Sequence, residues 1–405
     1  MVRAATLPRE RTSPRGWVRA WVARTFVFGP TDKTYRRLLM VMLLLGLGAV
    51  LSATFPLADK SLNADDQHEF VTRQLLFGGA GLLLMLGTSY LAPAVLVGIS
   101  RWAFPLGLAT MLMCRYSQWA HYVDGCWGWL KFGEGKTVQP SEMVKVFYVA
   151  FLAMLMASDR RQSTDWPAQK RVWAQALLAM GAMCGVLLIQ QDLGMIFVVF
   201  ATTLAVLFLR GIPWWQLVVV AVSLGTAGGL VAKLVFPERW NRVLVFLDPF
   251  VKYREGGEHV RQMLGTLARG GVQGSGLGMC PDKWGALPTP HTDSIFCVVG
   301  AELGLLGALL VLGLVFMLAN RSLRIGLRSG DTTAWYLASG MGLLLAIQAV
   351  INIAVATAMM PCTGLTLPFI SAGGSSLVAS LTAAGVVLAV SRMAHRSEGR
   401  DLDCG

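Results

Sequence analysis

The chain has 405 residues, of which 55% are hydrophobic and only 14% are charged, and its mean hydropathy is +0.56. Soluble domains carry about 25% charged residues. The composition therefore excludes a soluble enzyme, a disordered chain or a fibre and predicts an all-α polytopic membrane protein. The net charge of +12 mostly indicates cytoplasmic loops in such a protein. No basic helix or aromatic-interleaved basic patch indicates nucleic acid as a partner.

Residues 1–37 form a strongly basic segment. No short apolar core with a small-residue cleavage site follows it, so we interpret it as a retained cytoplasmic tail rather than a signal peptide. Beyond it, ten apolar stretches are long enough to cross a bilayer as helices of about 20 residues. They lie near residues 38–56, 75–93, 101–119, 141–158, 172–190, 193–209, 213–236, 293–319, 332–358 and 368–391.

Basic residues predict the orientation of these spans. Lys and Arg gather in both tails, in the loop that contains Arg160 and Lys170, and in the loop that contains Arg324. The positive-inside rule places all four in the cytoplasm. The expected parts are a cytoplasmic tail at 1–37, transmembrane helices one to seven at 38–236, a large periplasmic loop at 237–292, helices eight to ten at 293–391 and a cytoplasmic tail at 392–405.

The large loop between spans seven and eight is unusually basic for an outer segment. Its cations are Arg239, Arg242, Lys252, Arg254, Arg261, Arg269 and Lys283. One interpretation is an anionic ligand, such as a phosphate near the lipid headgroups, because guanidinium and ammonium groups bind phosphate well. The alternative is a translocated loop with solvated charges, since long loops escape the positive-inside rule.

Asp293 stands at the start of the eighth span, after Pro288 and Pro290. A carboxylate at the outer membrane edge, beside a basic loop, could act as a general base on a sugar hydroxyl. The competing interpretation is structural, because Thr292 or Asp293 would also be a favourable N-cap for the helix that follows.

Other polar residues lie within or at the edge of spans. Glu142 and Lys145, spaced i, i+3 at the start of the fourth span, allow a local ion pair, and ordinary helix-start chemistry is the favoured explanation. Asp192 either caps the sixth span or braces an outer cavity. Gln348 and Asn352, spaced i, i+4 in the ninth span, either bond to neighbouring helices or line a polar path.

Two further patterns leave alternatives open. The glycine-rich run at 265–278 is either a loop whose amides approach phosphate or a flexible connection. The spacing of the Cys and His residues predicts no zinc site. Cys126, Cys280 and Cys362 fall on the expected outer side, where a disulfide between two of them could form.

Taken together, these segments resemble the SEDS family of shape, elongation, division and sporulation proteins, from about residue 36 to 392. Gln139-Pro-Ser-Glu-x-x-Lys145 is similar to the family's Q-P-S-E-x-x-K, and Gln190-Gln-Asp-Leu-Gly194 to its Q-P-D-L-G. His291-Thr-Asp293 resembles its H-T-D. The last motif, Gly364-Leu-Thr-Leu-Pro-Phe-Ile-Ser371 with Gly373-Gly-Ser-Ser376, resembles the division branch (FtsW-like) more than the elongation branch (RodA-like).

The sequence departs from the family pattern at several positions, which indicates a divergent member. The family's Glu after L-P is Thr289, its Arg before Trp129 is Gly128, its Pro in Q-P-D-L-G is Gln191, its aromatic before Gly-Gly is Ala372, and the Lys of its T-K-G is replaced, leaving Cys362-Thr-Gly364.

The resemblance implies a peptidoglycan glycosyltransferase of the bacterial inner membrane that polymerises lipid II into β-1,4 glycan strands during cell division. It implies that Asp293 is the general base on the acceptor GlcNAc 4-hydroxyl and that undecaprenyl pyrophosphate leaves the growing chain. A class B penicillin-binding transpeptidase and other divisome proteins would be its partners at the septum. A lipid-linked precursor flippase and a noncatalytic divisome scaffold are the alternatives.

The resemblance also implies a set of site residues. Those expected to bind the substrate and its pyrophosphate are Arg239, Arg242, Arg261, Lys283, His291 and Thr292. Those expected to support the cavity are Glu142, Lys145, Asp192, Gln348, Asn352, Ser371 and Ser375. A divalent cation, Mg²⁺ or Mn²⁺, could share the charge of the pyrophosphate, although no sequence motif indicates a metal site.

Overall fold

A computed structural model describes residues 24–60, 65–123, 125–133, 137–158, 166–235, 244–246 and 257–403. Long helices dominate this part of the chain. They are α2 (Lys33–Lys60), α3 (Asp65–Tyr90), α4 (Pro93–Tyr116), α5 (Pro140–Ser158), α6 (Trp166–Gln190), α7 (Leu193–Leu209), α8 (Trp214–Val235), α11 (Ile295–Arg328), α12 (Thr332–Ala356) and α13 (Gly374–Asp403). A shorter helix, α10 (Gly257–Gly270), and a 3₁₀ turn, η2 (Pro281–Trp284), lie between α8 and α11.

These helices identify a multi-pass membrane protein, as the composition predicts. Within the described residues, seven helical segments are long and apolar enough to span a membrane, and they belong to α2, α4, α5, α6, α11, α12 and α13. α7 and α8 contribute shorter apolar helices, Leu193–Leu209 and Trp214–Leu230. α3 exposes Leu75, Leu76 and Leu83, as a lipid-facing surface would. The expectation of a helical polytopic membrane protein is confirmed.

Several helix boundaries differ from the expected ones. α3 begins at Asp65 and α4 at Pro93, well before the apolar stretches that start near 75 and 101. Hydropathy locates only the apolar part of a helix, whereas α3 continues through polar residues. Pro93 occupies the first turn of α4, where a proline's fixed φ suits the helix and its missing N–H costs nothing. α3 and α4 are therefore joined by a very short turn.

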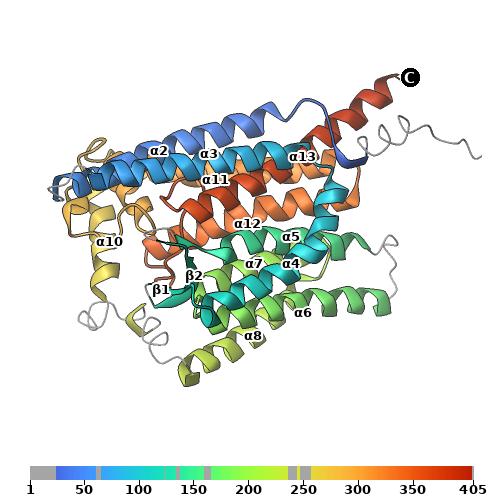
Figure 1. Ribbon diagram of the computed structural model, residues 1–405, viewed down its shortest axis with the longest axis horizontal. Helices are drawn as coiled ribbons and strands as arrows, with labels where there is room; N and C mark the ends of the chain where they lie inside the picture. Colours follow the sequence, from blue (N-terminus) through green and yellow to red (C-terminus); the bar gives the residue numbers. More distant parts are fainter. Residues whose placement is uncertain are drawn as a thin grey trace, which may run out of the picture.

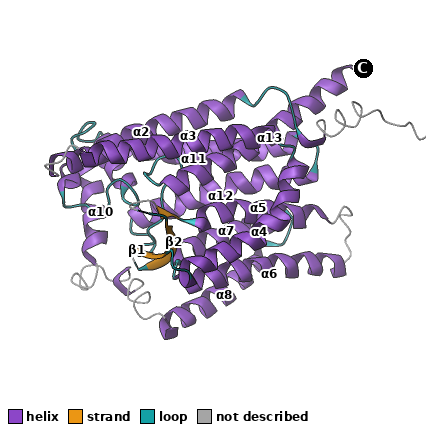
Figure 2. Cartoon of the chain, in the orientation of Figure 1, coloured by secondary structure: helices purple, strands orange, loops and turns teal. Residues whose placement is uncertain are grey.

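A small antiparallel sheet adds an element that the hydropathy pattern does not indicate. Its strands are β1 (Ala120–Val123), β2 (Cys126–Lys131) and β3 (Thr137–Val138), in the order β1-β2-β3. Figure 2 shows them in orange between the helical segments. Aromatic residues dominate the hairpin, and Tyr122 and Trp127 pack with ring centroids 4.9 Å apart. The sheet leads directly into α5, so it fixes where that helix begins.

The long helices lie side by side, so the bundle has two ends (Figure 1). One end carries α10 and the sheet, and we call it the loop end. The other carries the C-terminal part of α13, and we call it the tail end. Because α11 begins near α10 and runs toward the tail end, Asp293, two residues before α11, lies at the loop end.

The most extensive helix contact among the described residues joins α3 and α13. A Cβ atom added to Gly385 would lie 2.6 Å from the Met85 carbonyl oxygen, and one added to Gly81 would lie 2.6 Å from a Leu381 methyl group. Glycine therefore lets the two backbones approach closely, which is how helices gain van der Waals contact where no hydrophobic force drives them together in lipid.

α11 is interrupted at Gly304, whose φ of 69° and ψ of −165° are accessible essentially only to glycine. The break removes helical partners from nearby carbonyl groups. The glycine-rich segment 270–278 supplies replacements: the Ser275 amide donates to the Ala301 carbonyl at 2.9 Å, and the Gly276 amide donates to the Glu302 carbonyl at 3.0 Å. These amides therefore brace α11, a role that differs from both expected alternatives, phosphate binding and a flexible connection.

At the tail end, Asp32 joins three helices. Arg321 of α11 donates to both carboxylate oxygens, at 2.9 and 2.5 Å, and the Tyr35 amide of α2 donates at 2.8 Å. The Asp32 amide donates to Ser391 of α13 at 2.7 Å. Burial alone would raise the pKa of Asp32, but the hydrogen bonds from Arg321 and Tyr35 outweigh it and lower the pKa.

We expect Arg321→Met to lower the free energy of unfolding by about 2 kcal/mol or more, because it leaves the buried Asp32 carboxylate without its charged partner. Thermal unfolding of the purified protein in detergent would measure the effect. Arg324→Met is the matched control, since Arg324 is exposed and its side chain donates to Asn320 of its own helix. Equal losses in the two variants would contradict the assignment.

Candidate active site

Asp293 is held by hydroxyl groups and does not cap a helix. The N-cap of α11 is Ser294, so the expectation that Thr292 or Asp293 fills this position is wrong. The Asp293 Oδ1 atom instead accepts hydrogen bonds from the Thr289 hydroxyl at 2.9 Å and the Thr292 hydroxyl at 2.5 Å. The carboxylate is partly exposed, so it is available for chemistry.

The segment 364–372 lies against the Asp293 segment and is fastened to it by backbone contacts. The Ser371 hydroxyl donates to the Thr292 carbonyl at 2.6 Å, and the Ala372 amide donates to the His291 carbonyl at 2.8 Å. A Cβ atom added to Gly364 would lie 4.0 Å from the Asp293 Oδ2 atom. Two of the expected residues, His291 and Ser371, are thus brought beside Asp293.

Asn352 on α12 connects the same two segments. Its Nδ2 group donates to the Asp293 carbonyl at 3.2 Å and to the Leu365 carbonyl at 2.6 Å. The Asn352 side chain is buried, where an amide without partners would be costly. Asn352 therefore bonds one helix to two loop segments, which supports the interpretation as a bonding group rather than as the lining of a polar path.

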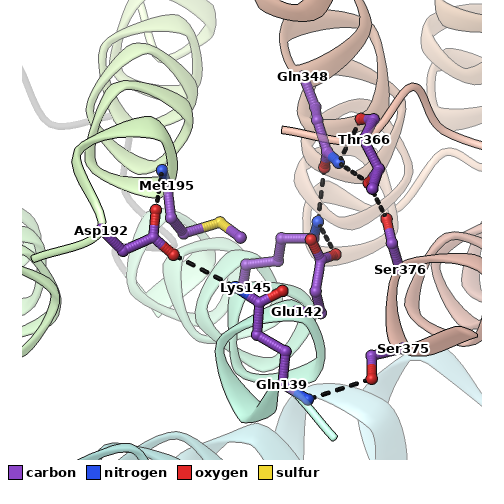
Figure 3. Close-up of polar contacts among 9 residues, drawn as sticks. All are labelled: Gln139, Glu142, Lys145, Asp192, Met195, Gln348, Thr366, Ser375 and Ser376. Carbon is purple, nitrogen blue, oxygen red and sulfur yellow. Dashed lines mark hydrogen bonds and ion pairs between the residues drawn. The ribbon is translucent and has the colours of Figure 1, made fainter. Parts of the chain in front are cut away.

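A second buried network starts at α5. Lys145 forms an ion pair with Glu142, as the i, i+3 spacing predicts, and its Nζ atom donates to the Gln348 Oε1 atom at 2.5 Å. The Gln348 Nε2 atom donates to the Thr366 carbonyl at 3.0 Å. Figure 3 shows this chain of contacts, which continues from the Thr366 hydroxyl to Ser376 at 2.6 Å. The ion pair thus reaches the segment that faces Asp293.

Asp192 caps α7, the first of the two expected alternatives, and it also contacts Gln139, the residue before α5. Its Oδ1 atom accepts the Met195 amide of α7 at 3.0 Å, and its Oδ2 atom accepts the Gln139 side chain at 3.3 Å. The backbone amide of Gln139 donates to the Ser375 hydroxyl at 3.1 Å (Figure 3). Ser375 therefore supports the start of α5.

The turn before Asp192 explains one departure from the family pattern. Gln191 has a φ of 63°, which proline cannot adopt because its ring fixes φ near −65°. The replacement of the family's Pro by Gln191 therefore accompanies a different backbone at this turn, whereas Asp192 keeps its contacts on both sides.

Lys283 lies in a buried ion pair with Glu302. Its Nζ atom donates to Glu302 at 3.0 Å, to the Gly278 carbonyl at 2.7 Å and to Ser52 of α2 at 2.9 Å. The side chains of Lys283 and Glu302 are only 1% and 4% exposed. The structure therefore gives Lys283 a bracing role between η2, α11 and α2, in contrast to the expected contact with pyrophosphate.

Of the three remaining cations expected to bind pyrophosphate, the structure describes one. Arg261 is exposed on α10, at the loop end. Arg239 and Arg242 lie outside the described residues. α10 also presents His259, which the sequence analysis does not single out; its Nε2 atom lies 3.3 Å from the Ser294 hydroxyl. α10 thus places an imidazole beside the residue that precedes α11, and it carries an exposed cation on the same helix.

His291 lies two residues before Asp293, and its charge state depends on burial. Burial lowers the pKa of His291, although the charge of Asp293 acts in the opposite direction. Burial likewise raises the pKa of the Cys280 thiol. No disulfide links Cys126, Cys280 and Cys362, all of which belong to the described part of the chain.

The described residues contain no group of three or more His, Cys, Asp or Glu side chains that could hold a metal ion. Asp293 alone therefore does not offer a complete ligand set for Mg²⁺ or Mn²⁺. A divalent cation at this site stays a prediction.

The fold and the site define a multi-pass membrane protein with a partly exposed carboxylate at one end of the bundle and buried ion pairs beneath it. The model of a cell cycle protein family, that of FtsW, RodA and SpoVE, matches residues 33–396. The chain belongs to this family, and the resemblance to SEDS proteins is confirmed.

Individual relatives match over most of their length. The chain is 34% identical over 361 residues to a probable peptidoglycan glycosyltransferase FtsW of Coxiella burnetii, with 88% of this chain and 94% of that protein covered. It is 32% identical over 375 residues to the stage V sporulation protein E of Bacillus subtilis, with coverages of 89% and 98%.

Solved structures have the same fold. One similar chain comes from a peptidoglycan synthase complex described as coordinating polymerisation and crosslinking, with a TM-score of 0.72, 29% identity, and 89% of this chain and 98% of that chain covered. Another is the rod shape determining protein RodA of Thermus thermophilus, with a TM-score of 0.64, 26% identity, and coverages of 89% and 97%.

We expect Lys145→Met to lower the free energy of unfolding by about 3 kcal/mol, because it leaves Glu142 buried without its partner. The double variant Glu142→Gln with Lys145→Met removes both charges and should be closer to the wild type. The free energies of unfolding of the wild type, the single variant and the double variant would be compared in detergent. If the single and double variants lose equal stability, charge pairing is not the source of the effect.

Stability should also fall as the pH falls, in part through His291. The pKa of His291 is lower in the folded state than in the unfolded state, so the unfolded chain binds more protons below about pH 6.5. Protonation therefore stabilises the unfolded state relative to the folded state. Thermal unfolding at about pH 7.5 and about pH 5.5 would measure this. His291→Gln should show a smaller loss, and an unchanged loss would contradict the role of His291.

Proposed function

We propose that the chain is a peptidoglycan glycosyltransferase that polymerises lipid II into β-1,4 glycan strands, with Asp293 as the general base. The observation that carries this proposal is the Asp293 carboxylate, whose Oδ1 atom is held by two hydroxyl groups while the group stays partly exposed at the loop end. Membership in the FtsW, RodA and SpoVE family supports the class of reaction, as does the name of the relative from Coxiella burnetii.

In the proposed reaction, the GlcNAc 4-hydroxyl of an incoming lipid II is the acceptor. Asp293 removes the hydroxyl proton as the oxygen attacks the anomeric carbon of the growing chain. The bond from that carbon to undecaprenyl pyrophosphate breaks, the pyrophosphate leaves with the electron pair, and the configuration inverts from α to β. The proton ends on Asp293 and returns to solvent.

The leaving pyrophosphate carries negative charge, and cations at the same end of the bundle would stabilise it. Arg261 is suited by its exposure on α10, and Arg239 and Arg242 are further candidates from the same loop by sequence. Lys283 contributes indirectly, since its ion pair with Glu302 fixes η2 against α11. Oriented donors of this kind stabilise developing charge, and each typically contributes 10²- to 10³-fold in rate.

The proposed setting is the bacterial inner membrane, with both termini and the tail end in the cytoplasm and the loop end in the periplasm. The similar chain from a complex described as coordinating polymerisation and crosslinking supports a class B penicillin-binding transpeptidase as partner. Kinship with FtsW proteins supports a location at the division septum, where other divisome proteins would meet it.

We expect Asp293→Asn to reduce lipid II polymerisation by about 10²-fold or more, because an amide cannot accept the proton. Purified protein would be assayed by gel for glycan strands, with and without a transpeptidase partner. Glu258→Gln, an exposed carboxylate on α10, is the matched control and should stay active.

Other outcomes separate the alternative functions. Full polymerisation by the Asp293→Asn variant would remove the base role. Movement of labelled lipid II across vesicles without chain growth would indicate a flippase, and partner binding without turnover in any mixture would indicate a scaffold. The departures from the family pattern at Thr289 and Gln191 give the scaffold alternative its weight.

A further inference from the structure

The two oxygens of the Asp293 carboxylate have different surroundings. Oδ1 accepts both the Thr289 and the Thr292 hydroxyl, at 2.9 and 2.5 Å. Among the described groups, none donates a hydrogen bond to Oδ2, which faces the backbone of Gly364. Gly364 has a φ of 68°, a value that favours glycine, so this position presents no side chain to Oδ2. Oδ1 therefore accepts two hydrogen bonds, and Oδ2 accepts none from the described groups.

Thr289 reaches Asp293 from an unusual backbone conformation. Its φ is 42°, and β-branched residues rarely adopt positive φ. The Thr292 amide donates to the Thr289 carbonyl at 3.2 Å and closes the turn. This turn brings the residue four positions before Asp293 within hydrogen-bond distance of its carboxylate. Strained residues of this kind persist where the surrounding structure requires them, often at functional sites.

The hydroxyl at this position distinguishes the chain from the family pattern. That pattern has Glu where Thr289 stands, and an ionised carboxylate accepts hydrogen bonds but cannot donate one to Asp293. The Lys of the family's T-K-G is also missing here, where Cys362-Thr-Gly364 stands. One negative and one positive group are therefore lost together, which leaves the net charge of this region unchanged and replaces an acid with a donor.

We propose that Thr289 is a positioning residue for the glycosyl transfer, a claim that rests on the proposed function of Asp293. Together with Thr292 it fixes Oδ1, so that Oδ2 points to the acceptor hydroxyl and takes its proton. Thr289 touches neither sugar nor pyrophosphate in this role. Its effect falls on the rate of the chemical step rather than on substrate binding.

Three substitutions at position 289 test the proposal. Thr289→Val keeps the branched shape and removes the hydroxyl, so it should lower kcat about tenfold or more while KM stays unchanged, since misplacement of a catalytic group is costly. Thr289→Ser keeps the hydroxyl and should keep kcat close to the wild-type value. Thr289→Gly accepts the positive φ without strain, so it should be at least as stable as the wild type and still lose kcat.

The measurement is the initial rate of lipid II polymerisation at several lipid II concentrations, with thermal unfolding of each variant in detergent. Asp293→Asn is included in the same series. If Thr289→Val matches the wild type while Asp293→Asn is inactive, the positioning role is overturned and the base role stands. If Asp293→Asn is active, both claims are overturned. If Thr289→Gly loses stability and kcat together, Thr289 is only structural.

Discussion

Inside a bilayer, buried polar groups must find their partners within the protein, and the side-chain NH₂ groups of two residues on α12 do so at the site. Gln348 and Asn352 lie one turn apart, and both bond to backbone carbonyls of the segment 364–372. Asn352 also bonds to the Asp293 carbonyl. Lys145 sets the direction of the Gln348 amide, because an ammonium group donates only to its oxygen. The position of the candidate base thus depends on a chain of contacts that begins at a buried lysine of α5.

Much of the fold follows from the sequence because lipid permits few solutions. Apolar stretches of bilayer length must be helices, so their order is visible without a structure. The start of α3 at Asp65 is not, because a helix that leaves the lipid continues through polar residues. The sheet at 120–138 is equally hidden, since short aromatic strands between two spans carry no distinct periodicity. The break at Gly304 depends on the distant glycine-rich segment, and no local pattern indicates it.

Some site residues can likewise be predicted from the sequence, and others cannot. Asp293 is visible from its position at the edge of a span, and the pair of Glu142 and Lys145 from its spacing, because both signals are local. Lys283 is misassigned from sequence because its partner Glu302 lies inside the next span and only the folded chain brings the two together. Comparison with the family pattern presents Thr289 only as the loss of a Glu side chain. The structure shows that its hydroxyl donates a hydrogen bond to Asp293. A hydroxyl four residues before a candidate base is the signal that could have indicated it.

The junction at Asp32 has a consequence for how the protein is made. The Asp32 amide and the Ser391 hydroxyl are 359 positions apart in the chain, and the Gly29 carbonyl accepts a hydrogen bond from Arg392 at 2.6 Å. The segment that leads into α2 therefore cannot complete its contacts until α13 has been inserted. The Asp32 carboxylate likewise has no charged partner until Arg321 of α11 has been synthesised, so a nascent chain carries it unpaired with Arg321 for most of translation. A chain that ends before α13 lacks the contacts with Ser391 and Arg392 as well.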